Sequence, residues 1–242
     1  MQNMKLSVVM PVYNEAASVA QSMNRVLANE LVGQLIVVDD GSDDRSFEIV
    51  QQMARKDPRI TTCHHTTNRG KGAALRTGFR KVAHDVVVIQ DADLEYDPQD
   101  YPKLLVPIAN NSADVVYGSR YINRDSPASQ PYIYRAANFW ITYLSNLATG
   151  LALTDVETCY KCFRLRVIEE MVLTENRFGI EVELTAQAAA MGYRIAEVPI
   201  SYIGRTRSQG KKIGLKDGLE AFFCIVRHWK RSVTWQRVPK RV

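Results

Sequence analysis

Residues 85–97 decide the fold class, and they read DVVVIQDADLEYD. Residues 86–89 are a run of apolar side chains rich in β-branching, which is typical of a strand buried on both faces of a parallel sheet. Asp91 and Asp93 follow two residues apart, so in extended backbone both carboxylates point to the same side. The alternative without a functional role is that these two acids cap a following turn or helix.

A divalent cation would relieve the repulsion and the loss of water that burial imposes on two close carboxylates. Oxygen-only ligands suit Mg²⁺ or Mn²⁺, which keeps open positions for water and for the phosphate oxygens of a substrate. The pair therefore predicts a metal site that faces a phosphorylated ligand.

The residues before this stretch alternate between strand-like and helix-like patterns. Apolar strands are expected at 6–10, 35–38 and 60–63, and helices are expected near 19–27, 45–56 and 72–82. Such alternation indicates parallel βαβ units, in which ligands bind outside the carboxyl ends of the strands. The sequence thus predicts an α/β fold with a mostly parallel, Rossmann-like sheet flanked by helices. The polar residues expected at its binding edge are Tyr13, Glu15, Asp39, Asp40, Asp91 and Asp93.

The second half of the chain continues the alternation with longer connections. The expected elements are a helix at 100–110, a strand at 114–117, a long loop at 121–134, a helix at 136–153, a strand at 159–163, a helix at 180–191 and a strand at 194–202. The helix at 136–153 has a polar stripe and an apolar remainder, which core packing explains at least as well as lipid contact does. A loop at 204–212 combines glycines with dense positive charge and could fold over an anion.

The charge of the chain is concentrated at one end. Residues 204–242 hold 11 Lys or Arg and 2 Asp or Glu, a charge of +9, whereas residues 1–203 hold 20 basic and 24 acidic residues, a charge of −4. The last helix, expected at 215–231, has an apolar side flanked by basic residues. It could lie at a membrane interface or simply dock on the domain. The basic end alone is compatible with nucleic acid, a phosphorylated substrate or anionic lipid.

Two further patterns have ordinary explanations. Cys159 and Cys162 have the spacing of a redox or zinc motif, yet no second pair accompanies them, so free thiols in a reducing compartment are expected. Residues 68–72, NRGKG, lack the spacing of a phosphate-binding P-loop and read as an entry to a helix, although Arg69 and Lys71 could touch phosphate. No signal peptide is expected, and the uncharged stretch 136–154 is too polar for a membrane span, so we expect a cytosolic protein.

Six motifs in fixed order carry a resemblance to a known family. They are MPVYNE at 10–15, VDDGS at 38–42, NRGKG at 68–72, DAD at 91–93, GSR at 118–120 and the basic loop at 205–212. Together they resemble the family 2 glycosyltransferases of the GT-A fold, and within them the dolichyl- or polyprenyl-phosphate mannose and glucose synthases. The resemblance covers residues 6–213.

The resemblance implies a role for each matching residue. The nucleotide sugar would be held by Pro11, Tyr13, Glu15, Asp39, Asp40, Asp91 and Ala92. The Mg²⁺ or Mn²⁺ ion would be bound by Asp91 and Asp93, with Glu95 near it. The residues assigned to catalysis are Asp93, Arg120, Arg205 and Lys211, with Arg120 near the acceptor phosphate and Arg205 and Lys211 closing over the diphosphate.

The function implied is metal-dependent, inverting transfer of mannose or glucose from a nucleotide diphosphate sugar to a polyprenyl or dolichyl phosphate. An alternative is a family 2 enzyme that acts on a glycan or protein hydroxyl, which needs a base such as Glu181, Glu183 or Asp155. Another alternative is a non-catalytic subunit that binds nucleotide or a lipid surface, and a nucleotidyltransferase is a remote one.

The expected organisation follows from the same resemblance. Residues 1–213 would form the GT-A domain, and residues 214–242 would form a basic amphipathic helix and tail. The protein would lie at the cytoplasmic face of a membrane, held peripherally by an anionic lipid surface. A membrane-protein subunit remains open as a partner, and no nucleic acid is expected.

Overall fold

A computed structural model describes residues 4–122, 132–205 and 223–227. In the first half, strands and helices alternate as the sequence predicts. The elements are β1 (Leu6–Val12), α1 (Val19–Leu27), β2 (Val32–Asp39), α2 (Ser46–Ala54), β3 (Ile60–His64), α3 (Lys71–Phe79) and β4 (Val86–Ile89). β1 pairs in parallel with β2 and β4, and β2 pairs in parallel with β3. The carboxyl ends of these strands therefore meet at one edge.

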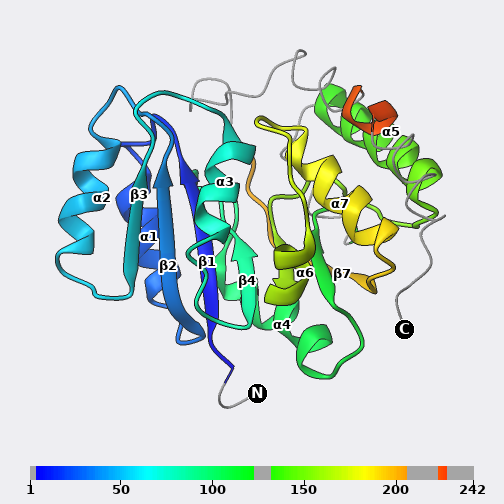
Figure 1. The fold of residues 1–242 in the computed structure, drawn as a ribbon, viewed down its shortest axis with the longest axis horizontal. Helices are drawn as coiled ribbons and strands as arrows, with labels where there is room; N and C mark the ends of the chain where they lie inside the picture. The colour runs from blue at the N-terminus through cyan, green and yellow to red at the C-terminus, as the bar shows by residue number, and fades with distance from the viewer. Residues whose placement is uncertain (1–3, 123–131, 206–222, 228–242) are drawn as a thin grey trace.

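The second half adds further strands to the same sheet. Its elements are a 3₁₀ turn η1 (Pro98–Asp100), α4 (Tyr101–Ala109), β5 (Val115–Ser119), α5 (Tyr132–Thr149), β6 (Lys161–Arg164), α6 (Leu165–Glu170), α7 (Ile180–Ala190) and β7 (Ile195–Pro199). Within the described residues the strand order is β3-β2-β1-β4-β6-β5-β7 (Figure 1). The pairings of β6 with β4 and β5 are antiparallel, and β5 pairs in parallel with β7. The predicted mostly parallel α/β sheet is confirmed.

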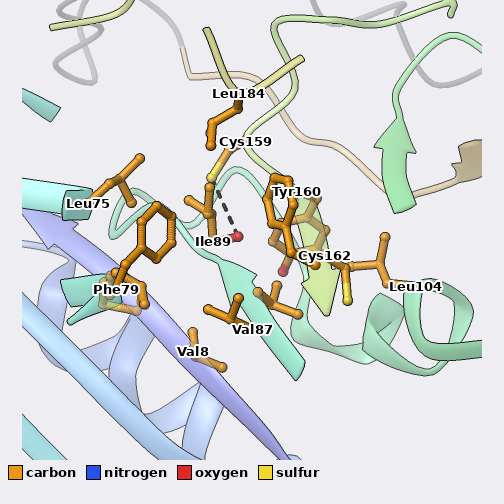
Figure 2. Close-up of a cluster of buried hydrophobic side chains, with 14 of the residues drawn as sticks. Val8, Leu75, Phe79, Val87, Ile89, Leu104, Cys159, Tyr160, Cys162 and Leu184 are labelled. Atoms are coloured by element: carbon orange, nitrogen blue, oxygen red, sulfur yellow. Dashed lines mark hydrogen bonds between the residues drawn. The ribbon is translucent and has the colours of Figure 1, made fainter. Parts of the chain in front are cut away.

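Apolar residues on both faces of the central strands form the core. Val86 to Ile89 are all buried, as expected for a strand covered on both sides. Figure 2 shows Leu75 and Phe79 of α3 on one side of β4 and Leu104 of α4 beyond Cys162 on the other. Gly78 lets α3 approach closely, because a Cβ there would lie 2.4 Å from Val9 Cγ1.

Several details differ from the sequence-based expectations. The strand expected at 159–163 starts later, at Lys161, because the preceding residues connect the long α5 to the sheet. α5 begins at Tyr132, inside the segment expected to be a loop. Core packing accounts for part of its apolar side, because Ile141, Leu144 and Ala148 are partly buried against the core, whereas the buried residues of this helix are Asn138, Thr142 and Ser145.

Other expectations are confirmed or lie outside the described residues. All cysteines are free, and three of them are buried (Cys159, Cys162 and Cys224). No helix in the described ranges is long and apolar enough to cross a bilayer. Of the C-terminal helix only residues 223–227 are described, and they are helical, while the basic loop beyond Arg205 lies outside the described residues.

Candidate active site

A cleft of about 330 Å³ opens at the carboxyl ends of β1, β2 and β4, within the size range of small-molecule sites. It brings together most of the residues that the sequence predicts for a nucleotide sugar. Those on its lining are Pro11, Tyr13, Glu15, Asp40, Asp91, Ala92, Asp93, Glu95 and Arg205. The lining also includes Asn68 and Lys71 of the NRGKG loop, and Arg177 and Phe178, which sequence analysis missed.

Asp40 organises the loop that forms one wall of the cleft. Its Oδ2 accepts a hydrogen bond of 2.6 Å from Gly70 N, and its Oδ1 lies 2.6 Å from His65 Nδ1. Arg69 N donates to both oxygens of the same carboxylate. Gly70 has φ +97°, a conformation that glycine adopts without the strain other residues suffer. Asp40 thus shapes the loop through backbone contacts.

Asp39 is fully buried behind the cleft at the end of β2, and it is not on the cleft lining. Its Oδ1 accepts from Ser42 N at 3.1 Å and lies 3.0 Å from His64 Nδ1. Its Oδ2 is buried and has no hydrogen-bond partner within the described part of the chain. A buried acceptor without a donor is energetically costly.

Asp91 and Asp93 lie on the cleft with Lys71 beside them. Lys71 Nζ is 2.8 Å from Asp91 Oδ1 and 2.9 Å from Glu181 Oε1. Burial raises the pKa of Asp93 to about 7, and repulsion from Asp91 and Glu95 adds to that shift. The cost of holding these charges together is what a bound cation would remove.

The donor set fits a hard cation that shares its ligands with a phosphorylated substrate. Within residues 4–122, 132–205 and 223–227, no three His, Cys, Asp or Glu side chains cluster as a metal site by themselves. Mg²⁺ is commonly held by one or two carboxylates together with substrate phosphates, which matches the Asp91 and Asp93 pair.

The side chain of Glu95 binds the segment at 202–205, which follows β7. Its Oε2 accepts a hydrogen bond of 2.6 Å from Tyr202 Oη, and its Oε1 accepts one of 2.6 Å from Arg205 N. Arg205 also forms an ion pair with Glu15, with Nη1 3.0 Å from Oε2. Glu15 and Glu95 therefore bring Arg205 over the cleft, and Lys211 lies outside the described residues.

Arg120 lies away from the cleft lining, at the end of β5. Its Nε and Nη2 donate to the two carboxylate oxygens of Asp155 at 2.7 and 2.8 Å. Its guanidinium also lies over the rings of Tyr121 and Tyr202, 5.6 and 5.2 Å from their centroids. The pair is buried, so Arg120 is a rigid cation beside the segment at 202–205.

The acids considered as a general base all have strong partners. Asp155 is paired with Arg120, and Glu181 is paired with Lys71 and Lys161. Glu183 accepts hydrogen bonds from the backbone of Thr174 and Glu175. None of them lines the cleft.

The chain is similar in sequence and in fold to known proteins. The sequence model described as Glycosyl transferase family 2 matches residues 7–172. An undecaprenyl-phosphate mannosyltransferase of Micrococcus luteus is 30% identical over 245 residues, which cover 99% of this chain and 99% of the relative. A dolichol-phosphate mannosyltransferase of Pyrococcus furiosus is 29% identical over 99% of this chain and 66% of its own length.

A solved structure has the same fold at low sequence identity. It is the glucosyl-3-phosphoglycerate synthase of Mycobacterium tuberculosis in complex with Mn²⁺, UDP and phosphoglyceric acid. It superposes with a TM-score of 0.72 at 17% identity, covering 94% of this chain and 79% of that one.

Proposed function

Because the chain belongs to glycosyltransferase family 2, we propose that it transfers mannose or glucose from a nucleotide diphosphate sugar to a polyprenyl or dolichyl phosphate. The observation that carries this proposal is the cleft, where paired acids and cations from distant parts of the chain converge at the strand ends. Two curated relatives named for transfer of mannose to a lipid phosphate support the acceptor class.

The nucleoside would lie against the wall of the cleft that is formed by Pro11, Tyr13 and the NRGKG loop. Asp39 Oδ2 would accept a hydrogen bond from the base, which satisfies an acceptor that the protein leaves without a donor. Asp40 would act indirectly, through the loop whose amides it binds.

Asp91 and Asp93 would hold Mg²⁺ or Mn²⁺ against the diphosphate. The ion would neutralise the charge that develops on the leaving group. Arg205, held over the cleft by Glu15 and Glu95, would contribute a second positive charge, and we assign Lys211 the same role.

The acceptor phosphate would approach beside Arg120. A phosphate oxygen is already ionised at neutral pH, so its attack on the anomeric carbon needs no strong base. The engagement of Asp155, Glu181 and Glu183 in ion pairs and hydrogen bonds fits such a reaction. Attack from the face opposite the leaving diphosphate would invert the anomeric carbon, and catalysis would rest on alignment and charge.

We further propose that residues 1–213 form the catalytic domain and that residues 214–242 associate with the cytoplasmic face of an anionic membrane. The excess of basic residues in 204–242 supports this assignment.

The test is an assay of the purified protein with a panel of nucleotide sugars, Mg²⁺ or Mn²⁺, and a short polyprenyl phosphate. The matched control acceptor is the corresponding polyprenol, which has a hydroxyl in place of the phosphate. We expect a glycosyl polyprenyl phosphate from the first acceptor and nothing from the second. Transfer to hydroxyl acceptors alone, or nucleotide binding without turnover on any acceptor, would refute the proposal.

A further inference from the structure

The buried side chains of helix α5 are polar, and Ile141, Leu144 and Ala148 pack partly buried against the core beside them. The buried polar side chains are Asn138, Thr142 and Ser145, spaced so that they form one stripe along the helix. Six large apolar side chains of the same helix are exposed, with exposed fractions of 83% for Tyr132, 62% for Ile133, 61% for Phe139, 58% for Trp140, 47% for Tyr143 and 55% for Leu147. A helix that stabilises a core shows the opposite arrangement.

Hydrogen bonds fix the inward side of α5. Val156 N donates to Thr142 Oγ1 at 3.2 Å, and Asn146 exchanges two hydrogen bonds with the backbone of Leu153, of 2.8 and 3.0 Å. The helix also contacts α7. The exposed apolar side is therefore held in a fixed orientation by contacts on the other side of the helix.

Three of the exposed side chains, Phe139, Trp140 and Tyr143, form a continuous aromatic surface. The ring of Trp140 is edge-on to Phe139 and to Tyr143, with centroids 5.6 and 6.0 Å apart. Phe139 and Tyr143 are nearly parallel at 6.3 Å. An exposed apolar surface of this kind indicates a binding partner.

The residue types on this surface favour a lipid bilayer as its partner. Trp and Tyr concentrate at membrane interfaces, where the ring is apolar and its polar atom reaches water. Residues 126–154 contain no Asp or Glu, so nothing in this segment repels anionic headgroups, and Arg135 is the charged residue present. Its guanidinium lies 5.3 Å from the centroid of the Tyr132 ring, at the start of the same helix.

We propose that the exposed aromatic side of α5 docks on a lipid bilayer, with Phe139, Trp140 and Tyr143 entering the boundary between headgroups and acyl chains. The choice of a lipid occupant rests on the proposed function, which requires a lipid-linked acceptor. The placement fits that acceptor: Thr142 binds the segment that carries Asp155, and Asp155 holds Arg120. α5 lies along the outer side of α7 (Figure 1), so its exposed aromatic side is open to a bilayer while its inner side contacts the segment that carries Asp155.

The first experiment is sedimentation with vesicles of phosphatidylcholine and phosphatidylglycerol that contain no polyprenyl phosphate. We expect the combined variant Phe139→Ser, Trp140→Ser, Tyr143→Ser to bind at least about tenfold more weakly than the unaltered protein. The matched controls Val106→Ser and Val172→Ser remove exposed apolar side chains elsewhere and should bind normally. Equal binding by the combined variant, or no binding by the unaltered protein, would overturn the proposal.

A second measurement does not depend on the folding of that variant. The chain has 3 Trp residues, so Trp229→Phe, Trp235→Phe leaves Trp140 as the only indole. Lipids brominated on the acyl chain should quench its fluorescence, and absence of quenching would contradict the proposed depth. A dimer in solution that the α5 substitutions dissociate would identify a second copy of the chain as the occupant instead.

Failure of the docking surface can be distinguished from failure of the proposed function. The combined variant should still glycosylate a short polyprenyl phosphate in solution without vesicles, since none of its substituted residues lines the cleft. If the unaltered protein binds vesicles through α5 but transfers sugar to no lipid phosphate, the function is wrong and the docking surface stands.

Discussion

Lys71 Nζ lies 2.8 Å from Asp91 Oδ1 and joins this carboxylate of the predicted metal pair to Glu181 in the first turn of α7. Burial alone would lower the pKa of Lys71, but the nearby charges of Asp91 and Glu181 outweigh burial and raise this pKa well above its usual value. Glu181 is in turn paired with the fully buried Lys161, whose Nζ also donates to the carbonyl of Val156 at 2.9 Å. A continuous row of buried charges therefore connects the cleft to the segment that carries Asp155.

The first prediction concerns the centre of this row. Glu181→Gln leaves two buried lysines without their shared counter-ion, and removing one partner of a buried pair costs about 3–5 kcal/mol of unfolding free energy. Urea unfolding at pH 7 measures the loss. Glu48→Gln, which breaks an exposed pair with Arg45, is the control and should leave stability unchanged within error. Equal stability of both variants would show that the row is not a structural unit.

The second prediction concerns the paired acids on the cleft. Asp91→Asn and Asp93→Asn should each lower kcat by about a hundredfold or more, because charge stabilisation of a leaving group is worth several kcal/mol. Asp85→Asn is the matched control, since Asp85 is an exposed acid next to the other end of β4. Mn²⁺ binding in the presence of nucleotide, followed by electron paramagnetic resonance, should weaken in the first two variants only. Unchanged turnover in either would refute a metal role for the pair.

The third prediction concerns recognition of the base by Asp39. Asp39→Asn replaces one hydrogen-bond acceptor of the side chain with a hydrogen-bond donor. An unpaired buried polar group costs about 1–3 kcal/mol, so the KM for the nucleotide sugar should rise about 5- to 150-fold. The acceptor KM should stay the same. Steady-state kinetics with each substrate varied in turn measures the split. A rise in both constants, or a stability loss without a KM effect, would assign Asp39 to structure alone.

The fourth prediction concerns pH and Glu157. Burial raises the pKa of Glu157 to about 7, and Glu181 and Asp155 add to the shift while Lys161 and Arg120 oppose it. Its Oε1 is buried without a hydrogen-bond partner in the described part of the chain. The folded state thus favours the protonated acid, and this contribution is complete below about pH 4.5 and is lost as pH rises through about 7.

Glu157→Gln should therefore match the unaltered protein in stability at low pH and exceed it at pH 8, by roughly 3 kcal/mol. Urea unfolding at pH 5 and pH 8 compares the two proteins. A difference that stays constant between these pH values would show that the titration of Glu157 is not coupled to folding.

Local sequence patterns were sufficient to predict the first strands of the sheet and the grouping of acids at its edge. The two-residue spacing of Asp91 and Asp93 after a buried strand determines that they share a side, and parallel βαβ order determines that they face the ends of β1 and β2. The cleft lining confirms this grouping for Tyr13, Glu15 and Asp40. These relationships depend on backbone geometry within a few residues and on chain order, both of which a sequence displays.

Only the tertiary structure decided the antiparallel insertion of β6 between β4 and β5, the pairing of Arg120 with Asp155, and the bridge from Lys71 to Glu181. It also decided that α5 turns its polar stripe inward, since periodicity defines two sides of a helix but not which of them meets the protein. Each of these features joins residues far apart in the chain. Their energies depend on burial and on distances set by packing, and neither is encoded in the spacing of neighbouring residues.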